Sequence, residues 1–136
     1  MFRRADHIPE SLASSPLASM VPLRELRALD RRGTSVRVAT GHTVMQEAGI
    51  GRECMVVIDG SFLVHRGDQV IAELASGDFI GEGSLLTDRP RSATVTASQD
   101  STVHAFNPRE FRSLLSECPT IAAHVRAVAD ERSLVA

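Results

Sequence analysis

Short β-branched segments alternate with glycines through the middle of this 136-residue chain, over residues 35–106. Segments of this kind, bounded by turn residues, are typical of β-strands. Strands are predicted at residues 36–39, 43–46, 55–58, 62–65, 70–74, 93–97 and 102–106. Their even spacing, with glycines between them, predicts an antiparallel β jelly roll or barrel.

Helical patterns precede and follow the predicted strands. Residues 16–30 carry leucines at the spacing of one helix face, Pro22 suits a first helical position, and Gly33 is expected to end the helix. After the last strand, the sequence Asn107-Pro108-Arg109-Glu110 combines a helix cap, a first-turn proline and a capping-box acid. A further helix is predicted to start at Pro119.

The last predicted helix carries an apolar stripe formed by Ile121, Val125 and Val128. A stripe at helical spacing more often packs against the core of its own domain than against a partner. The pattern as a whole predicts a mainly β fold with flanking helices. We expect one domain over residues 1–136, with an N-terminal helical segment at 12–30, a β-roll at 35–106 and C-terminal helices at 107–133.

Size and charge indicate a small cytoplasmic module. A chain of this length can bury about two-thirds of its unfolded surface, which is enough for one core. The net charge is −2 with acids and bases interspersed, so no face for nucleic acid or an anionic membrane is expected. No apolar run reaches membrane-spanning length, and the N-terminal stretch lacks the apolar core of an export signal. Cys54 and Cys118 are predicted to be buried free thiols in a reducing compartment.

The candidate chemistry lies between Gly77 and Val95, where the chain reads Gly-Asp-Phe-Ile-Gly-Glu-Gly-Ser-Leu-Leu-Thr-Asp-Arg-Pro-Arg-Ser-Ala-Thr-Val. Gly81 and Gly83 tolerate backbone angles closed to other residues and let the chain approach a ligand closely. A helical turn over residues 82–86 would point its free N–H groups at an anion. A lone Gly-Glu-Gly is usually only a turn, so the specificity depends on the side chains around it.

Three side chains add to this turn. Arg91 is always charged and can engage two phosphate oxygens at once, and Ser92 offers a further donor. The Glu82 carboxylate would repel a phosphate, so it is more useful accepting a hydrogen bond from a hydroxyl such as a ribose 2′-OH. A lone Arg-Ser pair is usually solvated surface, but the combination at this spacing predicts a site for a phosphate attached to a sugar.

This segment resembles the phosphate-binding cassette of the cyclic nucleotide-binding domain family. Residues 80–85, Ile-Gly-Glu-Gly-Ser-Leu, and residues 91–95, Arg-Ser-Ala-Thr-Val, match its two motifs at nearly every key position. The resemblance extends over about residues 12–133, with the cassette at 79–95, and implies the family's fold. It implies that Glu82 binds the ribose 2′-OH, that Arg91 and Ser92 bind the cyclic phosphate, and that backbone N–H groups complete the cradle. The implied cassette ligands are Gly81, Glu82, Gly83, Ser84, Arg91, Ser92 and Ala93.

The purine site follows from the same resemblance. Val64 and Leu74 match base-wall positions and Ala72 adds to them, whereas the absence of Trp and Tyr removes the aromatic cap of some relatives. Gly83 departs from the family pattern, in which an apolar residue is common. It is expected to loosen the short helix, because glycine costs about 1 kcal/mol relative to alanine in a helix interior. The ligand implied is cAMP in preference to cGMP, and no cofactor is expected.

The resemblance also implies how a signal leaves the domain. In the family the terminal helix moves when ligand binds and can cover the base or pair two subunits into a homodimer. The expected function is therefore a stand-alone sensor that relays ligand binding through its C-terminal helices to an unidentified protein effector. The chain ends at Ala136, before the position of the helix-turn-helix module of catabolite activator proteins, so no DNA-binding output is expected.

Two other functions fit a jelly roll. One is a protein-interaction module that has lost useful nucleotide affinity. The other is a metal enzyme of the cupin type, which needs a close His-x-His pair, a carboxylate and a distant third histidine. The histidines of this chain stand alone, at His7, His42, His65, His104 and His124. No catalytic and no metal-binding residues are therefore predicted.

Overall fold

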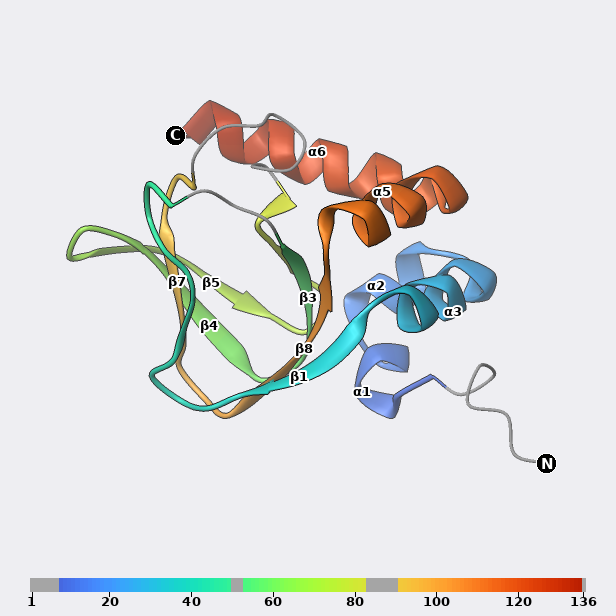
Figure 1. Cartoon of the computed structure of the whole chain (residues 1–136), viewed down its shortest axis with the longest axis horizontal. Helices are drawn as coiled ribbons and strands as arrows, with labels where there is room; N and C mark the ends of the chain where they lie inside the picture. The colour runs from blue at the N-terminus through green and yellow to red at the C-terminus, as the bar shows by residue number, and fades with distance from the viewer. Residues whose placement is uncertain (1–7, 50–52, 83–90, 136) are drawn as a thin grey trace.

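Two four-stranded antiparallel sheets face each other, and helices pack along the outer side of one of them (Figure 1). The computed structural model describes residues 8–49, 53–82 and 91–135. The first sheet has the order β1-β8-β3-β6 and the second the order β2-β7-β4-β5. The strands are β1 (Thr34–Val38), β2 (Thr43–Met45), β3 (Cys54–Asp59), β4 (Ser61–Arg66), β5 (Gln69–Ala75), β6 (Phe79–Ile80), β7 (Thr94–Ala97) and β8 (Ser101–Phe106).

The predicted mainly β fold is confirmed, with seven strands within about two residues of their expected bounds. The strand β6 was not predicted; it has only two residues and pairs with β3 through Met55 and Val56. Glycines supply the left-handed backbone that tight corners require. Gly60, between β3 and β4, has φ of 101°, and a Cβ there would collide with the side chain of Ser101.

The N-terminal helical segment consists of three short helices, where a single helix over residues 16–30 was predicted. They are α1 (Glu10–Ala13), α2 (Pro16–Met20) and α3 (Leu23–Arg32). The prediction was wrong at residue 21, because Pro22 pushes the residue before it out of the helical region and Val21 is extended, with φ −125° and ψ 150°. The helix after this break continues to Arg32 and ends at Gly33, as expected.

The two C-terminal helices are α5 (Pro108–Glu117) and α6 (Pro119–Val135). The predicted capping box is present at the start of α5. The side-chain oxygen of Asn107 accepts a hydrogen bond from the Glu110 N–H at 2.8 Å, and the Glu110 carboxylate accepts one from the Asn107 N–H at 2.9 Å. Ile121 and Val125 of the predicted α6 stripe are fully buried, so this part of the stripe packs against the domain's own core.

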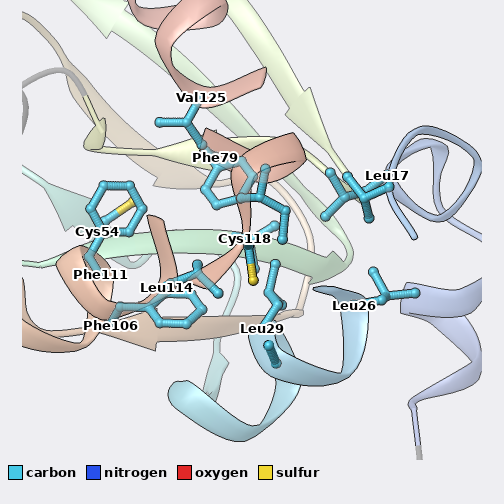
Figure 2. Close-up of a cluster of buried hydrophobic side chains, with 14 of the residues drawn as sticks. Leu17, Leu26, Leu29, Cys54, Phe79, Phe106, Phe111, Leu114, Cys118 and Val125 are labelled. Atoms are coloured by element: carbon cyan, nitrogen blue, oxygen red, sulfur yellow. The ribbon is translucent and has the colours of Figure 1, made fainter. Parts of the chain in front are cut away.

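The hydrophobic core has two parts because β3 and β6 are buried on both faces. One part fills the space between the sheets and includes Val57 of β3 and Ile80 of β6. The other part lies between the first sheet and the helices, and Figure 2 shows many of its side chains. Val56 and Phe79, the strand neighbours of Val57 and Ile80, point into this second part, because successive side chains of a strand alternate between faces.

Candidate functional site

The Arg91 side chain is held within the predicted cassette by contacts on two sides. It is only 8% exposed, and its guanidinium donates to two backbone carbonyls. One nitrogen bonds the Gly81 oxygen at 2.9 Å and the other bonds the Glu53 oxygen at 2.6 Å. A guanidinium carries five N–H groups, so these bonds leave others to engage an anion. The side chain is thus positioned by contacts within the chain itself.

Gly81 makes this arrangement sterically possible. Its φ is 85°, in the left-handed region that residues other than glycine rarely adopt. A Cβ on Gly81 would collide with a guanidinium nitrogen of Arg91 and would lie 3.0 Å from the Glu53 carbonyl oxygen. The predicted close approach of this glycine to a ligand stays a prediction; what the structure shows is a close approach to the guanidinium of Arg91.

Arg91 and Glu82 form the charged centre of the site. Glu82 is only 1% exposed, and its charge acts on Arg91. Burial lowers the pKa of the Arg91 guanidinium, whereas Cys54, Glu82 and Glu53 raise it. No carboxylate of the described residues is close enough to form an ion pair with Arg91. Within the described residues the guanidinium therefore has backbone carbonyls as its acceptors, and its remaining N–H groups are able to donate to an anion.

Backbone hydrogen bonds join residue 91 of the cassette to the turn at residues 48–49. The Arg91 N–H donates to the Gly49 carbonyl at 2.9 Å, and the Arg91 carbonyl accepts from the Ala48 N–H at 2.8 Å. Ser92 is exposed, and its carbonyl accepts a hydrogen bond from Arg66 at 3.0 Å. Ala93, the next predicted ligand, is buried.

Two residues that contact the cassette, Glu53 and Arg66, were not predicted from the sequence. Glu53 contributes a backbone carbonyl, which any residue could supply, so no side-chain signal marks it. Arg66 stands at the end of β4 in a polar hairpin, where an arginine is ordinary from sequence alone. Both are brought to the cassette by strand pairing at long range.

The three predicted base-wall residues share one face of the second sheet. Val64 pairs directly with Ala72, and Leu74 lies two residues further along the same strand. Leu74 is buried in the core between the sheets, Val64 is half-buried against that core, and Ala72 is exposed. The apolar wall is therefore continuous and becomes open to solvent towards Ala72.

Two of the predicted ligands, Gly83 and Ser84, lie outside the described residues, as does the helical turn expected over 82–86 apart from Glu82 itself. Of the predicted cassette ligands, Gly81, Glu82, Arg91, Ser92 and Ala93 lie within the described residues, and the Arg91 guanidinium bonds the Gly81 carbonyl. Val64, Ala72 and Leu74 lie on one face of the second sheet.

A polar hollow of about 320 Å³ lies elsewhere on the molecule and contains none of the predicted ligands; its lining residues are Arg37, Val38, Ala39, Asp59, Asp100, Ser101 and Thr102. Asp100 already accepts two hydrogen bonds from Thr40, at 2.9 and 2.8 Å. Among the described residues no group of three or more His, Cys, Asp or Glu could hold a metal ion. No helix in the described part of the chain is long and apolar enough to cross a membrane.

Both cysteines are buried thiols outside any disulfide, as predicted. Burial raises the pKa of Cys118 to about 11, with smaller contributions from the charges of Glu25 and Glu117 in the same direction. Its sulfur donates weakly to the Glu25 carbonyl at 3.9 Å. This thiol stays protonated at neutral pH and packs as a small apolar group.

A comparison with known protein families matches a part of the chain that includes the cassette. The family model described as a cyclic nucleotide-binding domain matches residues 35–118. A cyclic nucleotide-gated potassium channel from Rhizobium etli is 32% identical over 95 residues, which is 70% of this chain and 26% of the channel. This chain therefore spans about a quarter of that relative, and the likeness concerns one domain of it.

Solved structures share the fold. PKAR CBD2 with Sp-2Cl-cAMPS bound superposes with a TM-score of 0.79 at 23% identity, covering 93% of this chain and 85% of that one. The catabolite activator protein of Thermus thermophilus gives a TM-score of 0.73 at 26% identity, covering 88% of this chain and 58% of that one. The solved structures and the family model both agree with the mainly β jelly-roll fold described above. This chain belongs to the cyclic nucleotide-binding domain family.

Proposed function

We propose that this domain is a cAMP sensor that relays ligand binding through its C-terminal helices to a protein effector. The observation that carries the proposal is the buried Arg91 guanidinium, which contacts two carbonyls and no carboxylate among the described residues. A cyclic phosphate beside it would compensate this charge by charge-assisted hydrogen bonds, which are about twice as strong as neutral ones.

The ligand's other parts have matching surfaces. Glu82 would accept the ribose 2′-OH, and the apolar face of Val64, Ala72 and Leu74 would contact the purine. The described apolar wall offers no aromatic ring to stack on the base, so the phosphate and ribose contacts supply most of the affinity. We propose cAMP in preference to cGMP, with no cofactor besides the ligand.

The output is proposed to be a population shift. Phosphate engagement by Arg91 draws the cassette inward, and α5 and α6 reposition. A ligand moves such an equilibrium only by its differential affinity for the two states. The effector is a protein that distinguishes these two positions of the C-terminal helices, and a second copy of this chain pairing through α6 is one such partner.

A thermal-shift titration with cAMP, cGMP and 5′-AMP tests the proposal. A ligand that binds only the folded state adds about 2.7 kcal/mol of stability at 100 times its dissociation constant, which raises Tm by several degrees. We expect this rise with cAMP, a smaller one with cGMP at equal concentration, and none with 5′-AMP.

Two arginine variants make the titration specific. Arg91→Leu is expected to fold and to lose the shift, whereas Arg109→Leu, which removes an exposed arginine from α5, is expected to keep it. No shift with either cyclic nucleotide at millimolar concentration would contradict the sensor and favour the protein-interaction module. A shift that survives in Arg91→Leu would contradict the assigned phosphate site.

A further inference from the structure

The first turn of α6 is capped by a side chain from α3. The first N–H groups of a helix have no partner within the helix, and Cys118, which precedes α6, has no side-chain oxygen to offer them. The Glu25 side chain supplies the missing acceptor. Its carboxylate accepts hydrogen bonds from the Ile121 N–H at 2.9 Å and from the Thr120 N–H at 3.3 Å.

This contact is buried and charged. Glu25 is only 1% exposed, so its carboxylate is out of contact with water. A buried charge is costly unless hydrogen bonds and nearby dipoles compensate it, and the positive end of a helix dipole supplies both. An apolar residue would fill the same space at a lower desolvation cost. The carboxylate adds a directional bond that fixes where α6 begins relative to α3.

The first half of α6 packs against Phe79, the first residue of the cassette. Ile121 and Val125 pack in the same core cluster as Phe79, and the ring of His124 lies 6.3 Å from the Phe79 ring, centroid to centroid. Phe79 and Val125 lie next to one another in Figure 2. Phe79 belongs to β6, two residues before Gly81, the glycine whose carbonyl holds Arg91.

We infer that Glu25 is a positioning residue for the nucleotide response: it fixes the first turn of α6 to α3, so that α6 rests on Phe79 before ligand arrives. The inference rests on the proposed function. Its consequence is preorganisation, because a helix that is already docked does not have to be ordered when the ligand binds. The fixed end also makes any motion of α6 a rotation about its first turn.

Glu25→Gln is the test variant, and Glu117→Gln is its matched control. The glutamine has the same shape but only one acceptor oxygen, and its amide donors face the N–H groups that the carboxylate accepted. Glu117 also links α3 to the C-terminal helices, through an exposed ion pair with Arg32 at 2.7 Å. The control therefore removes an equal charge and another link to α3 without touching the cap.

Amide hydrogen exchange and cAMP titration are measured on both variants and on the unchanged chain. In the unchanged chain the Thr120 and Ile121 amides are expected to exchange slowly, unlike the first amides of an ordinary helix, and to stay slow when cAMP is bound. In Glu25→Gln we expect them to exchange at least tenfold faster and cAMP to bind at least threefold more weakly. Glu117→Gln is expected to match the unchanged chain in both.

Equal cAMP affinity of Glu25→Gln and the unchanged chain would overturn the inference and leave the sensor standing. Failure of the unchanged chain to bind any cyclic nucleotide would instead contradict the proposed function. If Glu25→Gln does not fold, the exchange of the unchanged chain decides: loss of protection at Thr120 and Ile121 on adding cAMP would show that the end of α6 is released, which overturns the inference.

Discussion

At the scale of single residues, Gly81 and Arg91 depend on one another. The guanidinium occupies the space that a Cβ on Gly81 would take, and the Gly81 carbonyl is one of its two hydrogen-bond acceptors. The Arg91 guanidinium can therefore lie against residue 81 only because that residue is a glycine with positive φ. The glycine of the motif thus sets the position of the arginine.

Gly81→Ala is expected to lower cAMP affinity at least tenfold, because the methyl group displaces the Arg91 guanidinium. Gly41→Ala is a close control: Gly41 has φ of 88°, against 85° at Gly81, and no atom lies within 4 Å of the position that a Cβ on Gly41 would take. Both variants carry the strain of a left-handed alanine, about 1–2 kcal/mol. Both proteins should therefore be destabilised. Calorimetric titration should show that only Gly81→Ala binds cAMP poorly. Equal affinities would mean that the guanidinium adapts.

At the scale of elements, the capping box of α5 is a local device whose value can be measured. Asn107→Ala removes the side-chain acceptor of the Glu110 N–H and is expected to cost about 1 kcal/mol of stability. For a chain of this size the corresponding fall in Tm is about 4 °C. Asn107→Asp keeps an acceptor and should fall much less. An unchanged Tm in Asn107→Ala would show that water replaces the cap.

Such local signals explain which elements the sequence could predict. The capping box, the β-branched segments and the corner glycines act within a few residues, so their elements were found. The break at Val21 was missed, although Pro22 carried the information, because the leucine spacing continues across it. The strand β6 was missed because two residues are too few to show a period and their pairing with β3 is set at long range.

At the scale of the whole molecule, the contacts that assemble the site join distant parts of the chain. The motif predicted Glu82 and Arg91, but nothing local predicts that Arg91 bonds the carbonyl of Glu53 or that Glu25 caps α6. In residues 16–30 a glutamate on a leucine-rich helix is ordinarily a solvated residue. Only the packing of α3 against the C-terminal helices turns it into a buried cap.

Glu25 also makes the stability of the molecule depend on pH. Burial raises the pKa of its carboxyl group, but the hydrogen bonds from Ile121 and Thr120 and the charge of Arg24 together outweigh burial, and the net pKa is lowered. A group whose pKa is lowered by folding stabilises the folded state above its unfolded-state pKa, and this stability is lost as pH falls through the folded-state pKa. The contribution should thus be complete above about pH 5 and decline below it.

Thermal unfolding of the unchanged chain and of Glu25→Gln between pH 3 and 7 isolates this contribution, because glutamine does not titrate. We expect the unchanged chain to be the more stable at pH 7 and the difference in Tm to shrink at the acid end. Asp100, whose pKa is lowered by hydrogen bonds from Thr40, gives an acid loss of the same sign in both proteins and cancels in the comparison. A difference that grows as pH falls to 3 would mean that Glu25 is protonated in the folded chain. The cap on α6 would then be a neutral carboxyl group, and its hold on the helix correspondingly weaker.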